Sequence, residues 1–358
     1  MVITEVRAKP KMLPYKESGW KIATGPLVGA RMIYVDILTE EGVVGRGCTS
    51  SGAPFLSGES EASVVHIIED VFSKLLIGKN PFDIEDIMRT LDRAALMNNR
   101  AKAGIDLALY DLMGKALGVP VRSLLGNSTS KRVPIMRLIG LKEPKSMADD
   151  AASLADQGYR ALKIKVGEDL RSDIARVGGI RHAVSDDVTL TVDINQAYSP
   201  KDAVELIHAL GQYGVAMIEQ PVSKEDISGM AYVRERVGIP VEADESVLTI
   251  ADAARVIVAK AADFISIKPI KMGGLNKAKK VAAVCEAFNV GCVVGTVAGS
   301  QLIDAANGHF IASTPNVWWA AEVGEFMRLQ DDPVSGLKIV DGFLEVSDGP
   351  GFGVSIVD

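Results

Sequence analysis

The chain has few cysteines, no apolar run long enough to cross a membrane and no cluster of basic residues. Only three of its 358 residues are cysteine, Cys48, Cys285 and Cys292, an odd number without metal-ligand spacing, so we expect reduced thiols and a cytoplasmic protein. The N-terminal segment lacks the apolar core of a signal peptide. The net charge is −7 with no basic run, which argues against nucleic acid or a membrane surface as a partner.

Five short apolar runs each deliver charged residues at their C-terminal end. They are ALKIKVG (161–167), LTVDIN (190–195), AMIEQP (216–221), PVEADES (240–246) and FISIKP (264–269). The residues Lys165, Asp193, Glu219, Asp244 and Lys268 follow one another at intervals of 24 to 28 positions, which fits one strand, one helix and two short loops. If these strands close into a parallel barrel, the five side chains meet at one mouth.

The chain is long enough for a barrel of about 200 to 250 residues and a smaller second domain. We predict an α+β domain over residues 1–130, a barrel over 131–322 and a C-terminal segment, 323–358, that rejoins the first domain. Helices expected at 59–78, 81–97 and 99–118 bury a core, and we see no chemistry in them. The predicted barrel strands lie near 133–141, 161–167, 188–195, 216–221, 240–246, 263–269, 291–296 and 317–322.

Six motifs in a fixed order carry a resemblance to a known family. They are AKAGIDLALYDLMGKALGVPVRSLLG, KIKVG, VDIN, IEQP, ADES and KPIKMGGL. The chain resembles the enolase superfamily and, within it, the muconate-cycloisomerase-like subgroup of the mandelate racemase and muconate lactonizing enzymes. The resemblance implies an α/β fold, a modified TIM barrel of the (β/α)7β type, with an N-terminal α+β capping domain completed by the C-terminal tail. It also implies one divalent cation, usually Mg²⁺ with Mn²⁺ as a substitute.

The resemblance assigns a role to six strand-end residues. Asp193, Glu219 and Asp244 match the metal ligands. Lys165 matches the base on one face of the substrate and Lys268 the acid or base on the other, while Lys163 matches the residue that touches the substrate carboxylate.

Elementary chemistry agrees with this assignment. Removing a proton alpha to a carboxylate creates an enediolate with a second negative charge, which a hard cation held by carboxylate oxygens can stabilise. Oxygen ligands favour Mg²⁺ over zinc. A lysine acts as a base only when it is neutral, so we expect desolvation, the cation and the neighbouring lysine to lower the pKa of Lys165. The seventh strand carries no histidine, unlike the acid-sugar dehydratases that the superfamily contains.

The substrate pocket is less clearly marked. Dipeptide epimerases of this family usually carry Asp-x-Asp in the eighth strand, where this chain has Ala320 and Glu322. This difference argues against a dipeptide as the substrate. Of Trp318 and Trp319, one should face the barrel interior, where Trp319 could bind a substrate ammonium; core packing is the alternative. Asn195 and Glu245 are further candidates, which could orient ligands or simply form structural hydrogen bonds. Trp20, Lys16 and Lys21 in the capping loop and Arg137 on the first strand are candidates to complete the pocket.

Several reactions fit two lysines on opposite faces of one carbon. We favour a racemase or epimerase of an amino-acid derivative, N-substituted or proline-like and possibly a betaine. The alternatives are a lyase, such as a hydroxyproline-type dehydratase, or a cycloisomerase, and more distantly a non-catalytic binding protein. The expected partner is a small-molecule carboxylate, and we expect a homo-oligomer.

Overall fold

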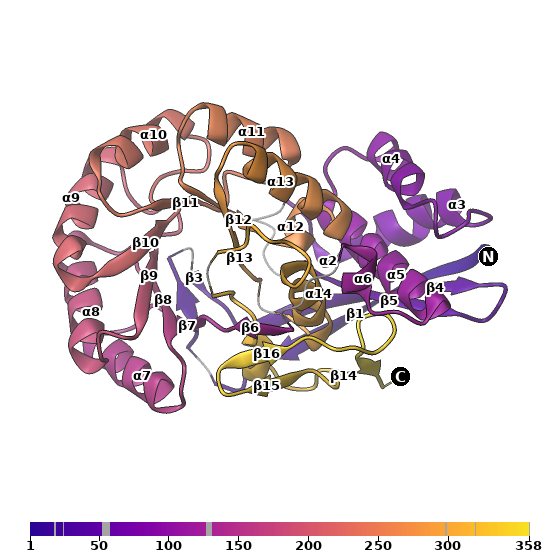
Figure 1. Cartoon of the computed structure of the whole chain (residues 1–358), viewed down its shortest axis with the longest axis horizontal. Helices are drawn as coiled ribbons and strands as arrows, with labels where there is room; N and C mark the ends of the chain where they lie inside the picture. The colour runs from indigo at the N-terminus through magenta and orange to yellow at the C-terminus, as the bar shows by residue number, and fades with distance from the viewer. Residues whose placement is uncertain are drawn as a thin grey trace.

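The computed structural model describes residues 1–17, 19–23, 25–51, 58–126, 131–297, 299–318 and 320–357. The chain forms a curled parallel sheet surrounded by helices, with an α+β domain beside it (Figure 1). Within the described ranges, no helix combines the length and the apolar character that crossing a membrane requires.

The barrel is built from seven parallel strands in the order β13-β12-β11-β10-β9-β8-β7. Their bounds are β7 (Arg137–Ile139), β8 (Ala161–Lys165), β9 (Thr189–Asp193), β10 (Val215–Glu219), β11 (Val241–Ala243), β12 (Phe264–Ile267) and β13 (Gly291–Val294). Almost every residue of these strands is buried, as expected for a parallel sheet covered on its outer face. Seven of the eight predicted barrel strands therefore exist, in the predicted order, but are shorter than predicted.

Helices lie on the outside of these strands, as Figure 1 shows for the arc from α7 to α11. They are α7 (Pro144–Asp156), α8 (Leu170–Ala183), α9 (Pro200–Leu210), α10 (Ile227–Arg236), α11 (Ile250–Val258), α12 (Pro269–Met272), α13 (Leu275–Ala287) and α14 (Gln301–Ile311), with the 3₁₀ turns η2 (Gly211–Tyr213) and η3 (Glu325–Arg328). Side-chain caps from Asp169, Ser199 and Thr249 begin α8, α9 and α11, because each satisfies an N–H that the first turn leaves free.

The first and last predicted strands of the barrel differ from expectation. The range 133–141 forms two strands: β6 (Arg132–Pro134) pairs with β16 (Phe343–Glu345) outside the barrel, and only β7 joins the barrel. In the range 317–322, the described residues form isolated bridges instead of a strand, Val317 with Cys292 and Ala321 with Ile135. Backbone bonds from Glu322 N to Val294 O at 2.9 Å and from Met136 N to Ala321 O at 2.8 Å still connect the two edges of the sheet, so this segment closes the ring.

The α+β domain has a three-stranded antiparallel sheet, β1-β4-β5. Its elements are β1 (Ile3–Pro14), β2 (Lys21–Ile22), β3 (Gly25–Pro26), β4 (Gly29–Thr39), β5 (Val44–Ser50), α2 (Glu61–His66), η1 (Ile67–Phe72), α3 (Ser73–Leu76), α4 (Ile84–Ala94), α5 (Asn99–Leu117) and α6 (Val121–Leu124). Helix α5 packs on β5 so closely that a side chain on Gly45 or Gly47 would collide with its backbone. The start of α5 also faces the barrel, because Asn99 donates to Lys271 O at 3.0 Å.

The C-terminal segment returns to the first domain, as the resemblance implies. Its strands are β14 (Val334–Ser335), β15 (Lys338–Val340), β16 (Phe343–Glu345) and β17 (Ser355–Ile356). Gly351 exchanges backbone hydrogen bonds with Val119 and Val121, and Phe352 N donates to Asp111 of α5 at 3.1 Å. The exact domain limits remain our proposal.

Candidate active site

The predicted strand-end residues come together at the carboxyl ends of the barrel strands. Lys165, Asp193 and Glu219 are the last residues of β8, β9 and β10, and they are direct neighbours in register: Lys165 with Asp193, and Asp193 with Glu219. Asp244 and Lys268 each follow their strand by one position, after β11 and β12. The repeat in the sequence therefore becomes an arc of acids between two lysines, as predicted.

Lys163 lies below this arc and is completely buried. Its Nζ is 2.5 Å from Glu219 Oε2, contacts Glu322 Oε1 and is 3.7 Å from Glu242 Oε2. Burial alone would lower the pKa of Lys163, but Glu219 and the other carboxylates outweigh burial and raise it well above its ordinary value. Lys163 is thus the cation that balances three buried acids, and it is not among the residues that line the pocket.

Each of the two outer lysines also faces an acid. Lys165 Nζ contacts Asp193 Oδ2, and Lys268 Nζ lies 2.5 Å from Asp244 Oδ2. Burial lowers the pKa of each lysine, but the facing carboxylates raise it by more. The expected lowering of the pKa of Lys165 is therefore not found in this structure, because the negative charge of Asp193 and its neighbours stabilises the ammonium form.

Lys165 and Lys268 border one pocket of about 140 Å³ at the mouth of the barrel. Its other walls come from the capping loop, from the segment around α5 and from the loops that follow the strands. Those residues are Tyr15, Trp20, Ile22, Leu27, Glu59, Met97, Asn99, Arg100, Leu138, Asn195, Asp244, Glu245, Leu248, Lys271, Thr296, Val297 and Glu325.

The acids at this mouth suit a hard divalent cation in chemistry. Among the described residues, no three acidic, His or Cys side chains already lie at metal-binding distances from one another. Asp193, Glu219 and Asp244 each contact a lysine instead. Buried oxygens nevertheless lack hydrogen-bond partners here: Glu219 Oε1, Asn195 Oδ1 and Glu245 Oε2. Unpaired buried oxygens are costly, and an oxygen-only set is what Mg²⁺ prefers. The residues present fit such an ion.

The remaining predicted residues divide between the pocket and other positions. Asn195 and Glu245 line the pocket and bond to each other, Nδ2 to Oε1, at 3.2 Å. Burial, followed by the charges of Asp244 and Asp193, raises the pKa of Glu245 to about 7. Trp318 is 58% exposed and packs edge-on against Phe264, so it does not face the barrel interior. Trp319 lies outside the described residues, and its place in the pocket stays a prediction.

Glu322 is fully engaged within the protein. Its Oε1 contacts Lys163 and its Oε2 accepts from Thr296 N at 3.0 Å. Burial raises the pKa of Glu322, but Lys163, Lys268 and Lys165 outweigh burial and lower the pKa to about 2. The carboxylate is therefore charged and paired with Lys163, and each of its oxygens already accepts a hydrogen bond, so a substrate ammonium would have to compete for it.

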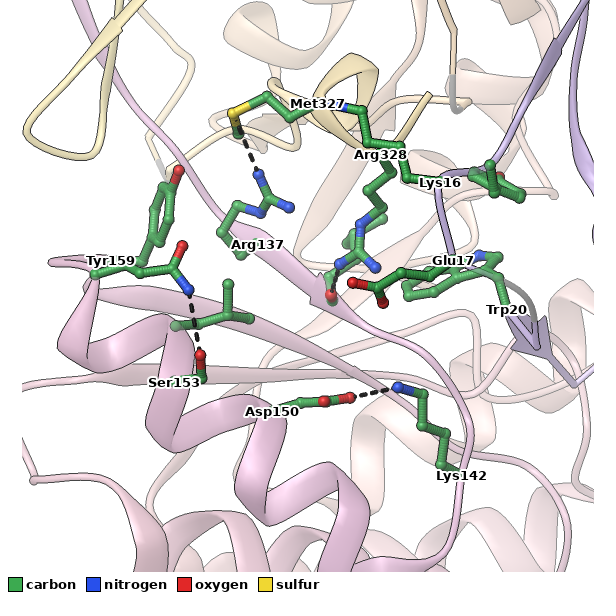
Figure 2. Close-up of a pocket in the computed structure, with 14 residues that line it drawn as sticks. Lys16, Glu17, Trp20, Arg137, Lys142, Asp150, Ser153, Tyr159, Met327 and Arg328 are labelled. Carbon is green, nitrogen blue, oxygen red and sulfur yellow. Dashed lines mark hydrogen bonds and ion pairs between the residues drawn. The ribbon is translucent and has the colours of Figure 1, made fainter. Parts of the chain in front are cut away.

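A second cavity of about 340 Å³ adjoins the pocket and shares Tyr15, Trp20 and Leu138 with it. Figure 2 shows Arg137 extending from β7 toward Met327 and Arg328 lying beside Trp20. Arg328 packs 4.0 Å from the Trp20 ring centre. Arg137 and Lys16 line this second cavity only, and Lys21 pairs with Glu168 at 2.7 Å, so of the loop candidates only Trp20 reaches the catalytic pocket.

Sequence reasoning missed several residues of the pocket and its floor. Asn99 and Arg100 belong to a helix in which no chemistry was expected, yet both line the pocket. Lys271 donates to Asp244 Oδ1 at 2.6 Å, and Glu242 is buried beside Lys163. A signal for α5 was present: charged residues in a segment with no polar face require buried partners or a function.

Two family models together cover nearly the whole chain. Residues 4–126 match the mandelate racemase / muconate lactonizing enzyme N-terminal domain, and residues 146–358 match the enolase C-terminal domain-like family. The chain belongs to the mandelate racemase / muconate lactonizing enzyme family of the enolase superfamily. This confirms the resemblance that the six motifs carry.

Curated relatives of this family member are epimerases, racemases and cycloisomerases. It is 37% identical to a hydrophobic dipeptide epimerase of Enterococcus faecalis, covering 99% of this chain and 100% of that protein. It is 30% identical to an N-succinyl-L-Arg/Lys racemase of Bacillus cereus (99% and 96% covered) and 31% identical to muconate cycloisomerase 1 of Rhodococcus opacus (94% and 91%). The chain is therefore an enzyme of the isomerase type found in this family.

Solved structures agree with the fold. The crystal structure of the Enterococcus faecalis dipeptide epimerase complexed with Mg and L-Leu-L-Tyr superimposes with a TM-score of 0.95 at 36% identity, covering 99% of this chain and 100% of that one. The N-succinyl Arg/Lys racemase of Bacillus cereus gives a TM-score of 0.96 at 30% identity, with 100% and 96% covered.

Proposed function

We propose that the chain catalyses Mg²⁺-dependent racemisation or epimerisation of an N-acylated amino acid by 1,1-proton transfer. The observation that carries this proposal is the placement of Lys165 and Lys268 on opposite arms of the carboxylate arc, bordering one pocket. An amino-acid Cα between them has one lysine on each face. One lysine removes the proton and the other returns a proton to the opposite face, which inverts the centre.

Asp193, Glu219 and Asp244 would hold the cation, with Asn195 and Glu245 beside them. A bound divalent ion would offset part of the charge of these carboxylates and would stabilise the second negative charge that develops on the substrate carboxylate. Lys163 keeps Glu219 oriented from below. Its direct contact with the substrate carboxylate is a further prediction from the family resemblance.

The state of Glu322 favours an acylated nitrogen over a free ammonium. The dipeptide epimerase is similar in sequence, but this chain has Ala320 in place of one expected acid. Its remaining acid, Glu322, is neutralised by Lys163 and accepts a hydrogen bond from the backbone N–H of Thr296. A substrate ammonium would have to compete with Lys163 for that carboxylate. An N-acyl amide carries no such charge, so it avoids this competition.

The test is a substrate panel followed by chiral chromatography in the presence of Mg²⁺. It contains N-acetyl and N-succinyl amino acids, prolines and their betaines, unblocked dipeptides and cis,cis-muconate. We expect inversion of N-acyl amino acids with kcat/KM at least about tenfold above that for unblocked dipeptides. Faster turnover of free dipeptides would contradict the N-acyl proposal. Lactone formation from muconate or loss of water from a hydroxyproline, without inversion of any N-acyl amino acid, would identify a cycloisomerase or a lyase instead.

A further inference from the structure

Arg100 is a buried cation in the wall of the catalytic pocket, and among the described residues no acid forms an ion pair with it. It is the second residue of α5, is 6% exposed and lines the pocket beside Asn99 and Lys271. Its Nη1 is enclosed and has no hydrogen bond. Within the part of the chain that the structure describes, no acid pairs directly with this guanidinium, although the charges of Glu59 and Asp244 lie close enough to act on it.

The acids nearest to Arg100 are already engaged elsewhere. The carboxylate of Glu59 accepts from the backbone N–H groups of Arg100 at 3.0 Å and Ala101 at 3.3 Å, so it caps the start of α5. Asp244 is held by Lys268 and Lys271. Burial lowers the pKa of Arg100, and the charges of Glu59 and Asp244 offset this only in part.

A guanidinium stays charged and offers five donors, and burying it without a partner destabilises the folded state. The backbone that carries this side chain is nevertheless anchored. Asn99 anchors the start of the helix to the barrel, because its amide donates to Leu248 O and Lys271 O, both at 3.0 Å. A buried arginine on an anchored helix start, with no ion-pair partner among the described residues, is arranged for an anion that comes from outside the chain.

We propose that Arg100 binds a second carboxylate of the substrate, so that the enzyme acts on N-acylated amino acids that carry a carboxylate away from the reacting centre. This inference rests on the proposed function. Lys271 joins Arg100's neighbour Asn99 to Asp244 and thereby to Lys268, so Arg100 lies toward the Lys268 arm. A substituent of Cα that points toward α5 meets it. Arg and carboxylate form paired, directional hydrogen bonds.

The second carboxylate can belong to the acyl group or to the amino-acid side chain, and unreactive probes separate these sources. N-succinyl-α-aminoisobutyrate tests the acyl group, and N-acetyl-α-methylglutamate tests the side chain. Each is compared with its own amide, N-succinamoyl-α-aminoisobutyrate or N-acetyl-α-methylglutamine. None of the four has an α-proton, so calorimetry with Mg²⁺ measures binding alone.

We expect one acidic probe to bind the wild-type enzyme about 10- to 100-fold more tightly than its amide, the range for a hydrogen-bonded charge pair. Arg100→Met should bring this ratio close to one, and Arg100→Lys should retain part of it. Arg137→Met is the matched control, because Arg137 is a buried arginine that does not line the pocket; it should keep the preference. Without ligand, Arg100→Met should melt at a higher temperature than the wild type, which also shows that the variant folds.

The inference is overturned if each acid and its amide bind the wild type equally, or if Arg100→Met keeps the preference. Either result leaves the proposed function standing when neutral N-acyl amino acids are still inverted. Conversely, if no N-acyl amino acid is inverted but the acid preference disappears in Arg100→Met, the anion site stands and the proposed reaction fails.

Discussion

At the scale of single residues, the site depends on the balance of charge around Lys163. Its buried ammonium forms ion pairs with Glu219 and Glu322 and lies 3.7 Å from Glu242. Both oxygens of Glu242 lack a hydrogen-bond partner, and burial raises the pKa of this carboxyl group. Without Lys163, three acids would lie in the barrel interior with no cation beneath them.

Replacing Lys163 by Met should lower the free energy of unfolding by about 3 to 5 kcal/mol, because it removes one partner of a buried charge cluster. Urea unfolding followed by circular dichroism measures this. Lys280→Met is the control, since Lys280 pairs with Glu85 at the surface and its loss should cost less than about 1 kcal/mol. Equal effects of the two substitutions would contradict this view of Lys163.

At the scale of elements, two buried aspartates attach helices to neighbouring parts of the fold. Asp106 of α5 accepts from Leu275 N at 2.5 Å and Asn276 N at 3.3 Å, and so caps α13 of the barrel. Asp304 of α14 accepts from Gly324 N at 2.7 Å, just after the segment that closes the ring. Burial raises the pKa of Asp106 to about 7 and that of Asp304 to about 8, despite these bonds.

Asp106→Ala should destabilise the fold by about 1 to 3 kcal/mol, because it leaves two buried N–H groups of α13 without an acceptor. Asp106→Asn keeps one acceptor oxygen and should therefore lower the free energy of unfolding by less. Thermal unfolding of both variants beside the wild type tests this. If Ala and Asn destabilise equally, the cap does not act through hydrogen bonding.

Asp304 predicts a pH dependence of stability. In the folded chain its carboxyl group keeps its proton up to about pH 8, whereas an unfolded aspartate loses it near pH 4. The contribution of Asp304 to the free energy of unfolding is therefore complete below about pH 4. It is lost as the pH rises to 8, by at most about 1.4 kcal/mol per pH unit. Asp304→Asn lacks this loss. In urea unfolding, the free energy of unfolding of the variant relative to that of the wild type should therefore be higher at pH 8 than at pH 5. A constant difference would refute the assignment.

The barrel strands and their charged ends could be predicted from the sequence, whereas the pocket residues on α5 and the position of Trp318 could not. The barrel and its arc of acids were predictable, because strand ends recur at the period of a βα unit and Lys165, Asp193 and Glu219 then fall into register. Arg100 was not, because helical periodicity identifies a buried face but not the cavity beyond it. Trp318 was interpreted from alternation along a strand, yet the described residues there form only isolated bridges.

At the scale of the whole molecule, the pocket forms where the first domain meets the barrel mouth. Trp20 and Arg100 come from the first domain, and Lys165, Asp244 and Lys268 from the barrel. A ligand bound there stabilises both parts together, since anything that binds the folded state alone shifts the unfolding equilibrium.

Magnesium should therefore raise the melting temperature, and EDTA should reverse the shift. At an ion concentration of about 100 times Kd the expected gain is about 2.7 kcal/mol. Asp193→Asn, Glu219→Gln and Asp244→Asn should each reduce the shift, whereas Asp187→Asn, a surface acid, should not. A shift that survives in all three variants would place the ion elsewhere.

The most direct test of the two-lysine account is α-proton exchange in D₂O, with each enantiomer of one N-acyl amino acid and Mg²⁺. The wild type should incorporate deuterium into both enantiomers and interconvert them. Lys165→Ala and Lys268→Ala should each abolish interconversion while retaining exchange with one enantiomer only, and the retained enantiomer should differ between the two variants. Exchange of both enantiomers by either variant, or loss of the same enantiomer in both, would contradict the assignment of one lysine to each face.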